Sequence, residues 1–247
     1  MIEIGKTHHL KVLKQEGDDL ILDGEELGTL PLPIKELPDA YQSANKVEVF
    51  LYPDSAQSLA VTTSKPLAEV GEFALLNVLS VTPYGAFLDW GMDRDLLVPF
   101  SNQQHEMIEG RDYIVYLYFD DVANRITATS YIERDLDQTP PPYFEGEKVN
   151  LLIADKTDIG TKAIINNAHW GVLYADEVFE NIQYGQKTTG YIKKIREDDK
   201  IDLYLHKPGY GEVDDLSRKI LDYLKAHDGS MEITDKSPPE VIYEQFG

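Results

Sequence analysis

The chain has 247 residues, with 23 Lys and Arg against 44 Asp and Glu, and a formal net charge of −21. This acidic excess repels phosphate polymers at long range, so any nucleic-acid contact must come from a local basic patch. The sequence contains no Cys, which excludes disulfides, thiolate nucleophiles and Cys-based metal sites. It begins without a signal-peptide pattern and no apolar run is long enough to span a bilayer, so we expect a soluble, cytoplasmic protein that makes no membrane contact.

One opening pattern, a Gly followed by a β-rich run, recurs at Gly5, Gly71 and Gly146. The glycines are 66 and 75 residues apart, which implies three units of one length. Each unit contains about five short runs rich in Val, Ile, Tyr and Phe between turn residues, and five such strands close most economically as a small barrel. One long β-sandwich is the alternative, but it does not explain a Gly at the start of each unit.

The spacers between these runs give the predicted domain limits. The units cover residues 1–64, 65–139 and 140–207. Pro140-Pro141-Pro142 reads as a stiff extended spacer before the third unit, whereas only Ser64-Lys65-Pro66 separates the first two. We therefore expect a tight junction between units one and two.

The period of the pattern changes in the segment 212–247. Apolar residues at helical spacing predict a helix from Leu216 to Gly229, and Ser237 with Pro238 opens a second helix after a short strand. Two short helices and one strand bury little apolar surface, so we expect the first part of a small domain that is cut before its third helix.

The charge is spread unevenly along the chain. Residues 140–207 hold 9 basic and 11 acidic side chains, whereas every other segment is strongly acidic. The basic side chains that could form a local positive surface in unit three are Lys162, Lys187, Lys193, Lys194, Arg196, Lys200 and Lys207. Solvated lysines that balance nearby acids are the alternative interpretation.

Three strings in unit two carry a family resemblance. They are Val81–Asp89, with an aromatic before Gly-Ala-Phe, then Asp95–Ser101, and then Asp121–Ile126, with an Asp four residues ahead of an Arg. This arrangement resembles the S-one RNA-binding domain, an OB-type barrel. Pro99 departs from that pattern because the family usually has His at this position, which removes one hydrogen-bonding contact.

The resemblance implies roles for four residues of unit two. Tyr84 and Phe87 match the pair that stacks on bases, and Asp121 and Arg125 match the polar and phosphate-facing pair. Flat side chains on a barrel face can stack on splayed bases, and a nearby Arg neutralises phosphate. For Phe87, burial in the barrel core is the alternative.

Units one and three resemble the same domain less closely. In unit three, Tyr174 falls at the His position, and Arg196 and Lys200 fall at the Asp and basic positions, so charge replaces stacking. Unit one shows no aromatic pair, and we do not expect it to bind RNA directly.

Three such units followed by a helix-strand-helix segment resemble the conserved virulence factor B family of bacterial RNA-binding regulators. The resemblance covers nearly the whole chain. It implies a mainly β fold of tandem five-stranded OB-type (S-one-like) barrels, with residues 212–247 as a partial winged helix. It also implies RNA binding in the cytoplasm with effects on gene expression and virulence, and no catalysis.

The sequence contains no motif that favours an enzyme. The sequence lacks Gly-x-Ser-x-Gly, a Walker loop and His-Glu-x-x-His. Acid pairs such as Asp93 with Asp95 could hold Mg²⁺ for a nuclease, but Asp in a turn is more often a cap of backbone amides. The six His residues are scattered, so we expect neither a metal site nor a cofactor.

Two hypotheses of function remain. The first is a non-enzymatic single-stranded-RNA-binding regulator in which unit two stacks bases. Unit three would then add backbone contacts through Lys162, Lys193, Lys194, Arg196 and Lys200. The second is an acidic protein-interaction scaffold that docks on a basic ribosomal or transcription component, with vestigial RNA binding.

Overall fold

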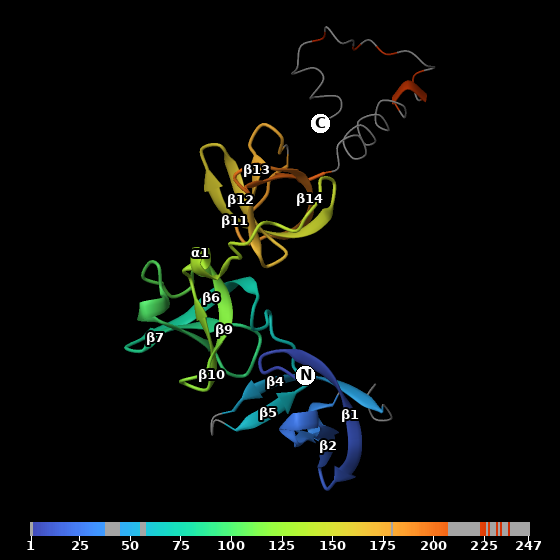
Figure 1. Ribbon diagram of the computed structural model, residues 1–247, viewed down its shortest axis with the longest axis vertical. Coiled ribbons are helices and arrows are strands. Elements are labelled where there is room, and N and C mark those ends of the chain that lie inside the picture. The colour runs from blue at the N-terminus through green and yellow to red at the C-terminus, as the bar shows by residue number, and fades with distance from the viewer. Residues whose placement is uncertain are drawn as a thin grey trace. The chain divides into compact units, whose positions relative to one another are not determined.

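The computed structural model describes residues 2–37, 45–54, 58–178 and 180–206, together with 223–225, 227, 231, 233 and 237. The chain divides into two compact units. The first holds residues 1–138 with 167–169 and 183–186, and the second holds the remainder. Three successive β-sheets follow the chain from blue through green to orange (Figure 1).

The first sheet has five strands in the order β3-β2-β1-β4-β5. They are β1 (Thr7–Glu16), β2 (Asp19–Asp23), β3 (Thr29–Pro33), β4 (Lys46–Pro53) and β5 (Leu59–Thr62). Short 3-10 turns at Glu25–Leu27 and Ile34–Glu36 flank β3. Side chains alternate along the strands, so that Leu10, Leu22, Leu32 and Val47 fill a common core while their neighbours face solvent.

The second sheet repeats this order as β10-β9-β6-β7-β8. Its strands are β6 (Phe73–Thr82), β7 (Gly85–Asp89), β8 (Leu96–Pro99), β9 (Asp112–Asp120) and β10 (Arg125–Thr129). A 3-10 turn at Phe100–Asn102 follows β8, and the single-turn helix α1 (Ile132–Asp135) follows β10. The Thr127 hydroxyl on β10 donates to the Leu97 carbonyl on β8 at 2.8 Å, which draws the two edge strands together.

The third sheet is a closed barrel in the order β11-β12-β13-β15-β14. Its strands are β11 (Lys148–Thr157), β12 (Gly160–Ile165), β13 (His169–Tyr174), β14 (Lys187–Ile195) and β15 (Ile201–Tyr204). β13 and β15 pair in parallel, whereas the β11–β12, β11–β14 and β14–β15 ladders are antiparallel. When the strands are numbered one to five within each barrel, all three barrels have the same order, 3-2-1-4-5. The third barrel is closed because its strands three and five also pair.

The repeated glycines occupy equivalent places in the three barrels. Gly5, Gly71 and Gly146 all have a positive φ, near 80°. Each donates its N–H to a carbonyl on the fourth strand of its own barrel, at 2.7 or 2.8 Å. The first strand of each barrel also carries a break in register four residues before its end. The internal repeat predicted from the sequence is therefore a repeat of backbone conformation.

The mainly β fold of tandem OB-type barrels is confirmed. The predicted C-terminal helices lie outside the described residues, apart from the helical stretch 223–225. The junction of barrels one and two is tight, as expected, because Phe50 of β4 belongs to the core cluster of barrel two, where its ring meets Trp90 edge-on at 5.9 Å. The first two barrels are accordingly parts of one compact unit.

Candidate nucleic-acid interface

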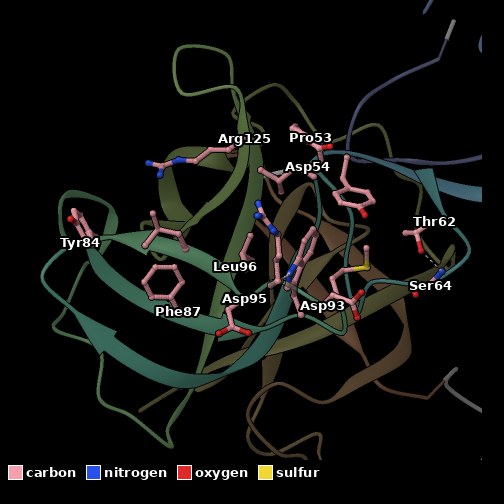
Figure 2. Close-up of a pocket in the computed structure, with 16 residues that line it drawn as sticks. Pro53, Asp54, Thr62, Ser64, Tyr84, Phe87, Asp93, Asp95, Leu96 and Arg125 are labelled. Carbon is pink, nitrogen blue, oxygen red and sulfur yellow. Dashed lines mark hydrogen bonds between the residues drawn. The ribbon is translucent and has the colours of Figure 1, made fainter. Parts of the chain in front are cut away.

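The predicted stacking pair lies on the β6–β7 hairpin of barrel two. Tyr84 is in the turn, where its N–H donates to the Thr82 hydroxyl at 3.2 Å, and its side chain is 77% exposed. Phe87 is half-buried on the outer face of β7, because its neighbours Ala86 and Leu88 point inward and fill the core. Burial of Phe87 in the core, the alternative considered above, is therefore wrong, and both rings line one cavity (Figure 2).

The β9–β10 turn brings Arg125 to the same cavity and leaves Asp121 outside it. The Asp120 carboxylate accepts the backbone N–H groups of Val122 and Ala123, at 3.1 and 3.0 Å, and so fixes the turn. Arg125 begins β10 and pairs with Asp120 in the ladder. Asp121 is exposed and is not among the cavity residues. The acid that shapes this turn is thus Asp120, one residue before the predicted one.

The cavity has a volume of about 630 Å³ and lies within the compact unit formed by the first two barrels. Figure 2 shows Tyr84 and Phe87 at one end of the drawn residues and Thr62 and Ser64 of barrel one at the other. This volume falls in the range of small-molecule pockets, about 300–1,000 Å³. Sequence analysis did not assign barrel one to this site, because the residues of barrel one that line the cavity are distant in the chain from those of barrel two.

Aromatic side chains that sequence reasoning missed form part of the cavity wall. Tyr52 and Trp90 line it, and Phe50 packs between them, stacked on Tyr52 at 6.3 Å between ring centroids. The Trp90 indole N–H donates to the Arg94 carbonyl, and the Trp90 carbonyl accepts the Leu67 N–H at 2.7 Å. These contacts hold the wall in place. An aromatic directly before Gly91 is the one sequence signal that could have identified Trp90.

Charges of both signs surround the cavity. Arg94 and Arg125 line it together with three carboxylates, those of Asp54, Asp93 and Asp95. Burial raises the pKa of the Tyr52 phenol, and the Glu36, Asp93 and Asp54 carboxylates raise it further. Tyr52 therefore stays a neutral hydrogen-bonding group at physiological pH. No group of three metal-binding acid or His side chains occurs within the described ranges.

In barrel three, Tyr174 and Arg196 meet around a buried acid. The Asp202 carboxylate accepts Arg196 Nε at 3.0 Å and Nη2 at 2.9 Å, which is a two-pronged contact. The Tyr174 hydroxyl donates to Asp202 at 3.2 Å and also contacts the Arg196 guanidinium. Asp202 is 8% exposed. The guanidinium is thus engaged within the barrel and is not a free phosphate-binding group.

Two lysines of barrel three are paired with acids as well. Lys193 forms an ion pair with Glu177, and this hydrogen bond is the main reason that the pKa of Lys193 is raised. Lys200 contacts Asp198 at 2.6 Å, which lowers the pKa of that carboxyl. Lys194 is exposed on β14. Of the predicted basic residues, Lys207 lies outside the described residues.

Barrel three also presents two aromatic rings that were not predicted from the sequence, those of Trp170 and Tyr204, beside the predicted Tyr174. The Lys162 ammonium lies over the Trp170 ring at 5.0 Å, and the Lys193 ammonium lies over the Tyr204 ring at 5.0 Å and the Tyr174 ring at 5.6 Å. Residues 170, 174 and 204 are all half-buried. These cations therefore lie over aromatic faces. The prediction that charge replaces stacking in this unit stays a prediction.

None of the helices in the described ranges has the length and apolar character of a membrane span.

Comparison with known proteins gives two family profiles. One, described as S1 domain, matches residues 4–64, and the other, described as CvfB-like winged helix domain, matches residues 218–247. The S1 match falls on barrel one, the unit judged least like that domain from its sequence. The second match falls on the segment predicted to be a partial winged helix.

Related proteins cover nearly the whole chain. Conserved virulence factor B of Staphylococcus saprophyticus is 24% identical over 253 residues, which are 98% of this chain and 84% of that protein. The uncharacterized protein YitL of Bacillus subtilis is 25% identical over 244 residues, 92% of this chain and 78% of that protein. A solved structure, a multidomain protein with nucleic acid binding domains from Streptococcus pneumoniae, covers 98% of this chain and 88% of its own at 21% identity, with a TM-score of 0.42. The predicted family resemblance is confirmed by the profiles and the two relatives.

Proposed function

From this resemblance to conserved virulence factor B proteins, we propose that the chain is a non-enzymatic protein of the cytoplasm that binds single-stranded RNA and regulates gene expression. The observation that carries the proposal is the exposed ring of Tyr84 beside Phe87 and Arg125 at the rim of one cavity. An unstacked base can stack on the two aromatic rings at this rim, and its phosphate can pair with the Arg125 guanidinium.

The ion pairs of barrel three set the expected strength of binding. Lys193, Arg196 and Lys200 must exchange a carboxylate for a phosphate before they contribute. Among the residues that the structure describes, Arg125 and Lys194 have no carboxylate partner to exchange. With about two phosphates neutralised on a single strand, the slope of log affinity against log salt is about −1.4, at ~0.7 per phosphate. Affinity is accordingly modest and depends mainly on stacking.

The test is a fluorescence-anisotropy titration of a labelled, unstructured RNA against the full chain at several salt concentrations. The double variant Tyr84→Ala/Phe87→Ala removes the rings, and Arg125→Gln removes the cation. We expect saturable binding that the first variant weakens at every salt concentration. Arg125→Gln should weaken it chiefly at low salt and reduce the slope. Failure of the unaltered chain to bind at tens of micromolar would refute the proposal.

A second candidate function is an acidic scaffold that docks on a basic ribosomal or transcription component. The internal pairing of Lys193, Arg196 and Lys200 favours it, because it engages three of the five barrel-three cations predicted to contact RNA, in a chain whose net charge is −21. The same chain titrated with purified ribosomal subunits separates the two functions. A scaffold retains its partner when Tyr84 and Phe87 are replaced by Ala, whereas an RNA-binding protein loses it.

A further inference from the structure

The cavity continues past the stacking pair into a region where barrel one supplies the wall. Tyr52 at the end of β4 and Thr62 at the end of β5 line this region, as do Asp93 and Asp95 of barrel two. Figure 2 shows the labelled residues of the two barrels side by side along the cavity. The stacking pair and the far wall therefore belong to one continuous space.

Contacts between the first two barrels fix this space in advance of any ligand. The Val70 N–H donates to the Gly5 carbonyl at 3.0 Å, and the Thr7 N–H donates to the Glu69 carboxylate at 3.0 Å. Lys65 and Glu48 form an ion pair in the same region. These bonds and the Phe50 ring join the two barrels. The walls of the cavity are therefore already in place, and ligand binding costs no free energy to assemble them.

The charges divide the cavity into two ends of different chemistry. Arg125 lies on the side of the stacking pair, where it suits a phosphate. The far end, beyond Phe87, presents the carboxylates of Asp54, Asp93 and Asp95 together with the Arg94 side chain and the neutral phenol of Tyr52. Carboxylates repel phosphate but accept hydrogen bonds from the exocyclic amino groups of bases, as Asp and Glu do for cytosine. The far end therefore fits a base edge.

We propose that the far end of this cavity holds a second nucleobase, one that carries an exocyclic amino group, from the same strand whose neighbouring base stacks on Tyr84 and Phe87. Barrel one thereby takes part in reading the RNA, although its sequence has no aromatic pair of its own. This inference rests on the proposed RNA binding and adds a preference for cytosine, adenine or guanine over uracil at one position.

The test compares labelled RNAs that differ at one base. An all-uridine oligonucleotide is titrated against the full chain beside oligonucleotides with a single central cytosine or adenine. We expect the cytosine- and adenine-containing RNAs to bind about tenfold more tightly, the size of one good hydrogen-bonded discrimination. Equal affinity for all three RNAs overturns the inference and leaves the proposed function standing, whereas no binding of any RNA overturns both.

Variants then assign the preference to the far end. Asp93→Asn/Asp95→Asn keeps the shape of the cavity but replaces two carboxylates, which only accept hydrogen bonds, by amides, which both donate and accept. This double variant should reduce the preference to less than twofold. Tyr52→Leu removes the ring of barrel one and should weaken the cytosine-containing RNA more than the all-uridine RNA. Asp18→Asn, in the β1–β2 turn outside the cavity, changes the charge alone and should preserve the preference. A preference that survives the double variant refutes the assignment.

Discussion

At the scale of single residues, Tyr84 combines high exposure with a fixed backbone. An aromatic ring that is 77% exposed contributes little to the core, so its removal should not affect folding. We expect Tyr84→Ala to weaken RNA binding about tenfold, within the ~1–3 kcal/mol of one stacked base, at an unchanged melting temperature. Anisotropy and thermal unfolding measure the two effects separately.

Phe144 provides the matched control for that prediction. It is 68% exposed, lies before β11 and is not among the residues assigned to RNA. Phe144→Ala should leave the RNA affinity unchanged. An equal loss of affinity in both variants would mean that exposed aromatic rings bind RNA non-specifically and that Tyr84 is not part of a specific RNA-binding site.

Asp202 is the residue on which the polar cluster of barrel three depends. It accepts both prongs of Arg196 and the Tyr174 hydroxyl while almost fully buried. We expect Asp202→Asn to reduce the free energy of unfolding by about 1–3 kcal/mol, because a hydrogen bond to a charged group is lost and the guanidinium keeps only a weaker partner. Urea unfolding followed through the Trp170 fluorescence measures this loss. An unchanged midpoint would show that the ion pair contributes nothing net.

At the scale of elements, the β6–β7 hairpin depends on Gly85. Its φ is +141°, and a Cβ there would lie 2.3 Å from the Val98 carbonyl oxygen on β8. We expect Gly85→Ala to destabilise barrel two by about 2 kcal/mol or more, since backbone strain and a steric clash combine. Urea unfolding followed through Trp90 fluorescence measures the change.

Gly17, in the β1–β2 turn, separates the two contributions. Its φ is also positive, at +59°, but a Cβ there would meet nothing within 4 Å. Gly17→Ala should therefore reduce the free energy of unfolding through backbone strain alone, by about 1 kcal/mol. If both variants lost the same stability, close contact between β7 and β8 would not be the reason for a Gly at position 85.

The short helix α1 introduces a pH dependence. Burial raises the pKa of the Asp135 carboxyl, with Arg134 opposing the shift. The unfolded chain therefore releases this proton at a lower pH than the folded chain, and stability falls as pH rises from the ordinary Asp pKa through the raised one. We expect Asp135→Asn to unfold at a higher temperature than the unaltered chain at pH 7 and at the same temperature near pH 3. A gain of equal size at both pH values would contradict the assignment to Asp135.

At the scale of the whole molecule, the chain has one Trp in each compact unit. Trp90 is in the first and Trp170 in the second. Because compact units generally unfold separately, we expect the single-Trp variants Trp90→Phe and Trp170→Phe to report different urea midpoints. Adding Asp202→Asn should shift only the midpoint that Trp170 reports. A shift of both midpoints together would mean that the chain unfolds as one cooperative unit.

The sequence by itself predicted the repeat and the strands of each barrel. Alternating apolar residues and turn residues are local signals, and Gly5, Gly71 and Gly146 need a backbone conformation that other residues rarely adopt, so their spacing survives in the sequence. The resemblance to the S-one domain, rather than these local signals, implied Tyr84 and Phe87 as a stacking pair and Arg125 as a phosphate-facing residue, and the structure places the two rings on one hairpin and Arg125 at the start of β10. The domain limits and the roles of these residues stay predictions.

Only the tertiary structure decided what these residues meet. The pairing of Lys193 with Glu177 and of Arg196 with Asp202 joins different strands or loops, and no local pattern records it. The cavity likewise depends on the ends of β4 and β5 meeting barrel two, which brings Tyr52 beside Trp90. Local conformation is set by neighbours in the chain and can be read from it, whereas ion pairs and cavity walls arise between segments whose distance is fixed only by packing.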